Sequence, residues 1–323
     1  LPALRALSQA VTMRRIAPLV LLALALAAVL APAATADPVQ QYSVQIKDVK
    51  PDGRYTIVYQ SNSFDTTGAA PPAITSSILR FPKGLGFRPA FLKRSRLCDI
   101  GALKTLLLAN QTSVLTYKKM LDDLPRTRKA IGEDLTGAQR RVLDTCAAAK
   151  IGAGTVKVDV RPVFGDLIPA FLWLFLTPPS EPGALVGFGI MSVTDQRAAV
   201  VRDNDIVAQQ KPNFTLNVFN DPSADGAFGY RLVLPPTVVN LVQISIAELR
   251  VTVPGLTDVK TRRTCAVKKG ARCARYKVKT TRSFWATPPT CPPSGRLSFL
   301  SDVSYETGQQ ITTPTSIACP RFG

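Results

Sequence analysis

Residues that commonly carry out chemistry are scarce in this chain of 323 residues, which contains six cysteines and no histidine. Without histidine, a Ser-His-Asp or Cys-His arrangement cannot form, and the commonest general base is missing. A zinc site built from cysteine and histidine is nearly excluded as well, since no Cys-x-x-Cys pair occurs. We therefore expect no catalytic residue, no cofactor and no metal ligand, and we predict that the protein is not an enzyme.

Acidic residues offer two weaker kinds of site. Asp122-Asp123 and Glu133-Asp134 lie in a segment of helical periodicity, where adjacent side chains point to different faces and cannot share a proton. Asp203-Asn204-Asp205 and the turn from Asp221 to Gly226 offer oxygen ligands for calcium, but both lack the spacing of a known calcium loop. We interpret the acidic pairs as solvated helix surface and the other two segments as polar loops.

The cysteines are the residues most readily assigned a role. An even number in an exported chain predicts three disulfides, although six cysteines allow 15 connectivities. Proximity along the chain favours the pairs 98–146, 265–273 and 291–319. The disulfide candidates are Cys98, Cys146, Cys265, Cys273, Cys291 and Cys319.

The most distinctive charged segment is 260–282, which contains ten basic side chains and no acid. Its turn Lys268-Lys269-Gly270-Ala271 lies between Cys265 and Cys273 and predicts a disulfide-clamped basic hairpin. Such a surface can hold a polyanion through contacts that weaken with salt, whereas the alternative is an edge strand that its cations keep soluble. The polyanion-binding candidates are Lys268, Lys269, Arg272, Arg275, Lys277 and Lys279.

The charge of the whole chain points to the same class of partner. Lysine and arginine number 40 against 22 acids, a formal net charge of +18, which attracts anionic surfaces. An arginine-rich genomic background would give the same number without a selected partner. We expect an anionic envelope polymer or a membrane surface as partner, and not nucleic acid, because no aromatic stacking platform lies among the charges. The oligomeric state is left open.

The N-terminal segment has the features of an export signal. Arg14-Arg15 precedes the apolar run Ile16–Leu30, and Ala34-Thr35-Ala36 offers a small-x-small cleavage site before Asp37. The run of 15 residues is shorter than the roughly 20 residues that a membrane-spanning helix needs. We predict cleavage after residue 36 and a secreted, extracellular or envelope-associated protein, with Met13 as the true start of translation.

Hydropathy repeats every second residue over most of the remaining chain. Tyr42, Val44 and Ile46 alternate with polar residues, and Pro51-Asp52-Gly53 predicts a hairpin turn. Helical spacing replaces this pattern at about 99–149, where a capping box is expected at residues 136–139. Further strands are expected at 74–81, 156–160, 167–176, 185–193, 214–219, 230–234, 242–253, 276–285, 296–305 and 310–317.

These patterns predict a mainly β fold, built as one or two antiparallel, immunoglobulin-like β-sandwiches with a helical insertion. The expected organisation is a signal peptide over 1–36, in which residues 1–12 either lie upstream of the true start or form a long n-region. A β-sandwich domain over 37–255 carries the helical insertion 99–149. A C-terminal basic, disulfide-containing β-region covers 256–323.

One apolar strand suggests a second function. Leu167–Leu176 is continuously apolar but too short to cross a bilayer as a helix, so we expect a buried strand or one that lines a groove. Phe171, Trp173 and Phe175 fall on one face of it. Such a face would suit a carrier of an apolar ligand or lipid, or a protein attached to a membrane surface, although rings of this kind are more often core.

An ordered set of weak features runs along the chain. Pro71-Pro72-Ala73-Ile74 leads into a strand that ends in the turn Arg80–Leu85, a cysteine pair follows, and Cys146–Val160 contains a Gly-x-Gly strand. A hairpin at Thr287–Pro292 and a final cysteine close the series. In this order the features resemble uncharacterised exported β-sandwich proteins of high-GC actinobacteria. The resemblance implies export and a β-sandwich, makes residues 99–145 an insertion, and implies no functional residue because the group has no established activity.

The sequence thus predicts a non-enzymatic, secreted structural or binding protein of the cell envelope or extracellular space, which contacts anionic polymers through its basic hairpin. The alternative from another class is an apolar-ligand or lipid carrier. A hydrolase is the least expected function, because no acid–base pair supports it.

Overall fold

The computed structural model describes residues 38–51, 53–93, 96–110, 114–131, 135–159, 167–194, 214–221, 226–234, 238–239, 242–243, 245–265, 275–286 and 290–321. The expected signal peptide, the calcium candidate at 203–205 and the hairpin turn at 268–271 lie outside these residues, as do Arg272 and Cys273. Residues 37–323 form one compact unit. Within it, the described strands before and after residue 255 join the same large sheet.

That sheet holds eleven of the described strands, each antiparallel to its neighbours. The strand order is β1 (Pro38–Lys47), β2 (Thr56–Asp65), β12 (Ser245–Val253), β5 (Lys150–Asp159), β6 (Leu167–Thr177), β7 (Val186–Thr194), β8 (Phe214–Asn220), β9 (Phe228–Leu234), β3 (Ile74–Pro82), β16 (Arg296–Tyr305) and β17 (Gln310–Ala318). Three two-stranded ladders accompany it: β10 (Val238–Val239) with β11 (Val242–Gln243), β13 (Thr257–Cys265) with β14 (Arg275–Ser283), and β15 (Trp285–Ala286) with β4 (Gly86–Phe87).

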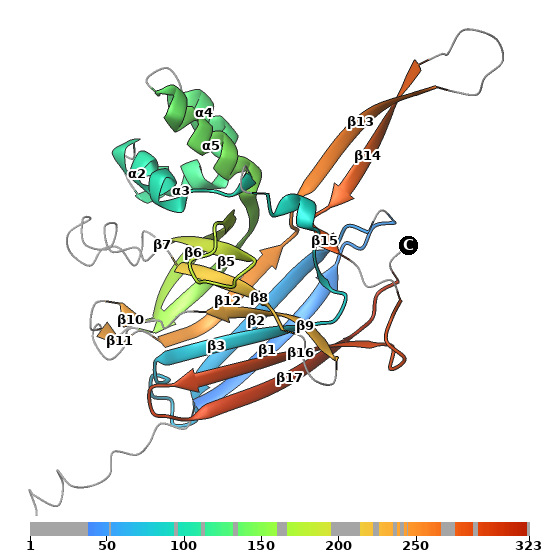
Figure 1. The fold of residues 1–323 in the computed structure, drawn as a ribbon. Helices are drawn as coiled ribbons and strands as arrows, with labels where there is room; N and C mark the ends of the chain where they lie inside the picture. Colours follow the sequence, from blue (N-terminus) through green and yellow to red (C-terminus); the bar gives the residue numbers. More distant parts are fainter. Residues whose placement is uncertain are drawn as a thin grey trace, which may run out of the picture. The chain divides into compact units, whose positions relative to one another are not determined.

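The sheet curls until its first and last strands meet (Figure 1). Across this seam, the Tyr305 hydroxyl donates to Gln40 Oε1 at 3.1 Å, and Thr313 Oγ1 donates to the Gln40 carbonyl at 3.4 Å. Burial raises the pKa of Tyr305 above its usual 10.0, so the phenol remains a neutral donor there. Side chains and strand contacts therefore cover edges that would otherwise present unpaired backbone groups.

The predicted mainly β, antiparallel fold with a helical insertion is confirmed, whereas an immunoglobulin-like sandwich is not confirmed. Strands of both arrangements bury alternate residues, so their hydropathy patterns are alike. In β16 the buried residues are Leu297, Phe299, Ser301, Val303 and Tyr305. A single sheet that curls around its own core also buries every second residue of each strand.

The helical insertion consists of α2 (Ile100–Asn110), α3 (Val114–Asp122), α4 (Leu124–Ile131) and α5 (Gly137–Ala149). Figure 1 shows these helices grouped on one side of the sheet, close to β6 and β7. The expected capping box is confirmed: Thr136 Oγ1 accepts from the Gln139 amide at 3.2 Å, and Gln139 Oε1 accepts from the Thr136 amide at 2.8 Å. Two orphan donors at the start of α5 are thereby satisfied.

Two of the three expected disulfides are confirmed. Cys98 and Cys146 are bonded and fully buried, and they tie the start of the insertion to its last helix. Closing a loop of this length stabilises the fold by about 4 kcal/mol in the chain-entropy model. Cys291 and Cys319 form the second bond, next to the β16–β17 hairpin. The pairing of Cys265 with Cys273 stays a prediction, since Cys273 lies outside the described residues.

Trp173 joins the insertion to the sheet. Its ring is 2% exposed, and its indole Nε1 donates to Asp122 Oδ1 at the end of α3 at 3.1 Å. Lys150 Nζ donates to the carbonyls of Leu121 and Asp122, each at 2.8 Å. A cation at this position satisfies terminal carbonyls and complements the helix dipole, although burial lowers the pKa of Lys150.

Gly189 in β7 lies directly under α2, and a substitution at this position tests how closely the helix packs on the sheet. A Cβ at this position would lie 1.8 Å from Ile100 Cδ1 and 2.6 Å from Thr177 Cγ2. Both neighbours are buried, so Gly189→Ala should lower the free energy of unfolding by about 1–3 kcal/mol through overpacking. Urea denaturation measures the loss.

Gly101→Ala is the matched control, because Gly101 is an exposed residue of α2 whose Cβ would meet only Asp99 Oδ1, at 3.4 Å. Alanine favours helix, so this variant should be as stable as the parent or slightly more stable. Equal stability of both variants would contradict the close packing of α2 on β7.

Candidate binding surface

The basic segment forms a two-stranded ribbon, β13–β14, that leaves the large sheet (Figure 1). Its register pairs Arg263 with Lys277, Thr261 with Lys279 and Cys265 with Arg275. Because alternate positions of a strand share a face, the basic positions 263, 275, 277 and 279 belong to one face of the ribbon. Of the sequence-predicted candidates, Arg275, Lys277 and Lys279 are thus brought together, while Lys268, Lys269 and Arg272 lie outside the described residues.

This register places like charges directly opposite each other at Arg263 and Lys277. Cross-strand pairs of one sign destabilise a ribbon rather than hold it together. The described part of the ribbon contains one acidic residue, Asp258, near its base. The Arg263–Lys277 pair therefore opposes the stability of the ribbon, whereas Asp258 opposite Arg282 supports it, and a local conflict of this kind is typical of functional surfaces.

A buried aromatic cluster holds the base of the ribbon. Phe284 and Trp285, which follow β14 directly, are 0% and 3% exposed. Phe87 lies between them and the sheet, with ring centroids 5.2 Å from Phe284 and 5.5 Å from Trp285. Tyr55 stacks on Trp285 at 5.8 Å, and Phe91 packs edge-on against Phe284 at 5.9 Å. Truncating one such ring to alanine typically costs about 3–5 kcal/mol.

Hydrogen bonds fix both strands of the ribbon at this base. The Phe284 amide donates to the Leu256 carbonyl at 2.7 Å, and the Phe284 carbonyl accepts from the Arg88 amide at 2.9 Å. Trp285 Nε1 donates to the Val253 carbonyl at 3.2 Å. Arg96 forms an ion pair with Asp258 at 3.3 Å.

A glycine makes this close approach possible. Gly255 has a φ of 72°, and a Cβ there would lie 2.9 Å from both Phe284 Cδ1 and Trp285 Nε1. From the sequence, Phe284 and Trp285 are expected only as the end of a strand over 276–285. The sequence contains a signal for their role at the base of the ribbon, because Phe284 and Trp285 are two adjacent large aromatic residues after a basic strand that has little other apolar content.

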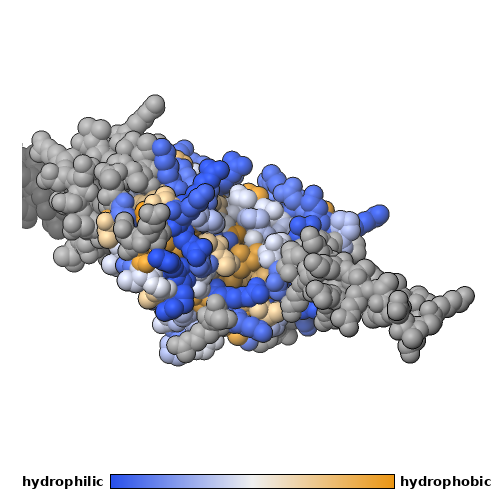
Figure 2. All heavy atoms as spheres, turned by 90° about the horizontal axis from the view of Figure 1, so that it is seen from above, coloured by the Kyte–Doolittle hydropathy of each residue, from blue (hydrophilic) through white to orange (hydrophobic). Residues whose placement is uncertain are grey.

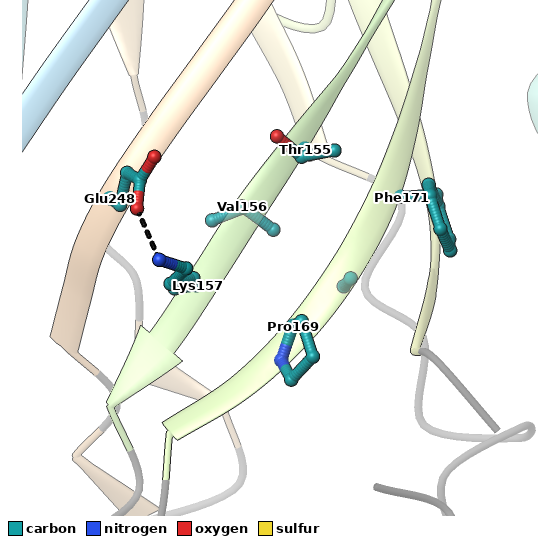
Figure 3. Close-up of a pocket in the computed structure, with 7 residues that line it drawn as sticks. Thr155, Val156, Lys157, Pro169, Phe171 and Glu248 are labelled. Carbon is teal, nitrogen blue, oxygen red and sulfur yellow. Dashed lines mark ion pairs between the residues drawn. The ribbon is translucent and has the colours of Figure 1, made fainter. Parts of the chain in front are cut away.

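A second surface feature lies on the outer side of the large sheet (Figure 3). Two hollows of about 200 and 480 Å³ are lined by residues of β2, β12, β5 and β6, and both are lined by Lys157 and Glu248. Lys157 Nζ lies 2.7 Å from Glu248 Oε2, so these two charges neutralise each other.

The remaining candidates are structural residues where they are described. Asp122 pairs with Lys118 at 2.7 Å, Asp123 pairs with Arg126 at 3.1 Å, and Asp221 binds Arg80 at 2.9 Å. No cluster of three metal-ligating side chains occurs within the described ranges. None of the helices described is long and apolar enough to cross a bilayer. On the face shown in Figure 2, hydrophilic residues surround a smaller hydrophobic area.

Comparison with known proteins adds no assignment. No protein-family model, curated protein or solved structure matches the chain. The similarity to exported actinobacterial proteins stays a prediction that rests on the sequence features alone. The basic ribbon combines a concentration of basic residues with a base of buried aromatic side chains, which makes it the candidate binding surface.

Proposed function

We propose that this protein is an exported, non-enzymatic binding protein that holds a linear anionic polymer on the ribbon β13–β14. The observation that carries the proposal is the register of the ribbon, which places the basic positions 263, 275, 277 and 279 on one face, the basic positions 260, 262 and 282 on the other, and Arg263 opposite Lys277. An anionic chain along this face would relieve the repulsion between the strands, so part of the folding cost would be recovered on binding.

The anchored base supports this function. Ordering a flexible basic segment on a polymer would cost conformational entropy, whereas a segment fixed at both strands has already lost part of that freedom. Phe284 and Trp285 on one strand and Leu256 on the other provide this fixation. Without residues 1–36, which hold three arginines and no acid, the chain keeps 37 basic and 22 acidic residues, and this net charge of +15 also attracts anionic polymers from a distance.

The other functions have less support. A carrier would use the face of Phe171, Trp173 and Phe175, but Trp173 and Phe175 are buried in the core. Lys118 Nζ lies 4.5 Å from the centre of the Phe171 ring. A hydrolase needs convergent acids, and the acidic pair Asp122-Asp123 is bound to basic side chains and to Trp173 instead.

Export is the second part of the proposal. The disulfides Cys98–Cys146 and Cys291–Cys319 fit a protein that folds in an oxidising compartment. Intact-mass spectrometry of protein recovered outside the cell should give a chain that begins at Asp37 and has no free thiol. An uncleaved chain in the cytosol with six free thiols would contradict export.

Replacing Arg263, Lys277 and Lys279 by glutamine tests the ribbon. Retention of the protein on immobilised poly(glycerol phosphate) should weaken about tenfold at 50 mM salt, because three phosphate contacts are lost. The slope of log affinity against log salt concentration should fall by about two for the same reason. A salt series with the parent and the triple variant measures both quantities.

The matched control replaces Lys129, Arg140 and Arg141, which are exposed on α4 and α5, and changes the net charge equally. This control should keep most of the affinity of the parent. Equal losses in the two triple variants, or retention that does not depend on salt, would contradict the proposal. Tighter binding to vesicles of anionic phospholipid than to the polymer would show that the partner of the ribbon is a membrane surface and not the polymer.

A further inference from the structure

The two hollows on the outer side of the large sheet share Lys157 and Glu248, and together they are called the outer groove. This groove consists of residues other than those of the basic ribbon and has a different chemistry. The register places Asn62, Glu248, Lys157 and Pro169 in one row across β2, β12, β5 and β6. The larger hollow is lined by Asn62, Glu248 and Lys157 of this row and is open to solvent, and its 480 Å³ falls within the range of about 300–1,000 Å³ that small-ligand pockets occupy. The groove is therefore large enough for a ligand.

The groove presents little net charge to a ligand. Lys157 and Glu248 form an ion pair at 2.7 Å, which Figure 3 shows on the floor between β5 and β12. Asp159, a third charged residue of the lining, is 1% exposed. The accessible polar groups are therefore the amides of Gln60 and Asn62, each of which offers both donors and an acceptor, and the Lys157–Glu248 pair, whose side chains are 53% and 35% exposed and together carry no net charge.

Apolar side chains border the groove on opposite strands. Phe64 at the end of β2 is 42% exposed, and Leu167 at the start of β6 is 37% exposed. Among the described residues, they are two of the three large hydrophobic side chains that are exposed, and the third is Leu185. The smaller hollow adds Pro169 and Phe171, which Figure 3 shows along β6. Their concentration at one groove indicates a ligand with apolar surface.

A sugar combines these properties, since its hydroxyl groups both donate and accept hydrogen bonds while its C–H face is apolar. We propose that the groove binds the neutral sugar residues of a glycan, with Gln60 and Asn62 bonded to hydroxyl groups and Phe64 against the apolar face. An extended peptide fits less well, because β12 and β5 pair on both sides and offer no free strand edge. This site is independent of the polyanion function of the ribbon.

Isothermal titration calorimetry of the intact protein with tetramers of β-1,4-linked glucose and β-1,4-linked N-acetylglucosamine tests the proposal. At least one tetramer should bind saturably, with a Kd below about 1 mM. Asn62→Ala and Phe64→Ala should each weaken binding about three- to tenfold, the range expected for one lost hydrogen bond or apolar contact. Because the sugars carry no charge, their binding releases no counterions, and the affinity should stay nearly constant between 50 and 200 mM salt.

Leu185→Ala is the matched control, because Leu185 is 38% exposed and does not line the groove. It should bind the tetramer as the parent does, and so should the Arg263, Lys277 and Lys279 triple variant. Sugar binding would then be shown for the groove even if the ribbon did not bind the polymer. No saturable binding of either tetramer, an equal loss in Leu185→Ala, or binding of a mixed nonapeptide pool in place of the sugars would overturn the inference. Thermal melts establish that the compared variants are equally folded.

Discussion

The packing of Phe284 and Trp285 against Phe87 is the interaction on which the placement of the basic ribbon depends. The ribbon has a sheet of its own, in which the Arg263–Lys277 pair opposes its order and only the Asp258–Arg282 pair near the base joins opposite charges. Its order must come from the base, where two fully desolvated rings and the backbone bonds of Phe284 fix the chain. Hydrophobic burial thus stabilises the ribbon at its base, and the part of the ribbon farther from the base can carry basic residues that repel one another.

The curled sheet provides the second constraint. Its outer strands meet through Gln40, Tyr305 and Thr313, so both edges are covered without a second sheet. The insertion α2–α5 covers part of the outer surface near β6 and β7, where Trp173 and Phe175 would otherwise be exposed. The uncovered part of the outer surface, over β2, β12, β5 and the start of β6, is where the groove lies.

The sequence predicted local features well and their arrangement poorly. Alternation in β1 and β16, the capping box at Thr136 and the Cys98–Cys146 bond depend on nearby residues or a simple period, so they could be predicted. Closure into one curled sheet could not, because it depends on contacts between strands more than 250 residues apart, as between Gln40 and Tyr305. The groove was missed for the same reason: Asn62, Lys157 and Glu248 become neighbours only through the strand order.

Hydrogen exchange at the base of the ribbon is the most direct test of the central claim that a buried aromatic cluster fixes it. The amides of Arg88 and Phe284 should exchange as slowly as those in the β5–β6 ladder, because only global unfolding exposes them. Exchange of these two amides at the rate of exposed loops, while β5 and β6 remain protected, would show that the ribbon is not anchored and would contradict the account.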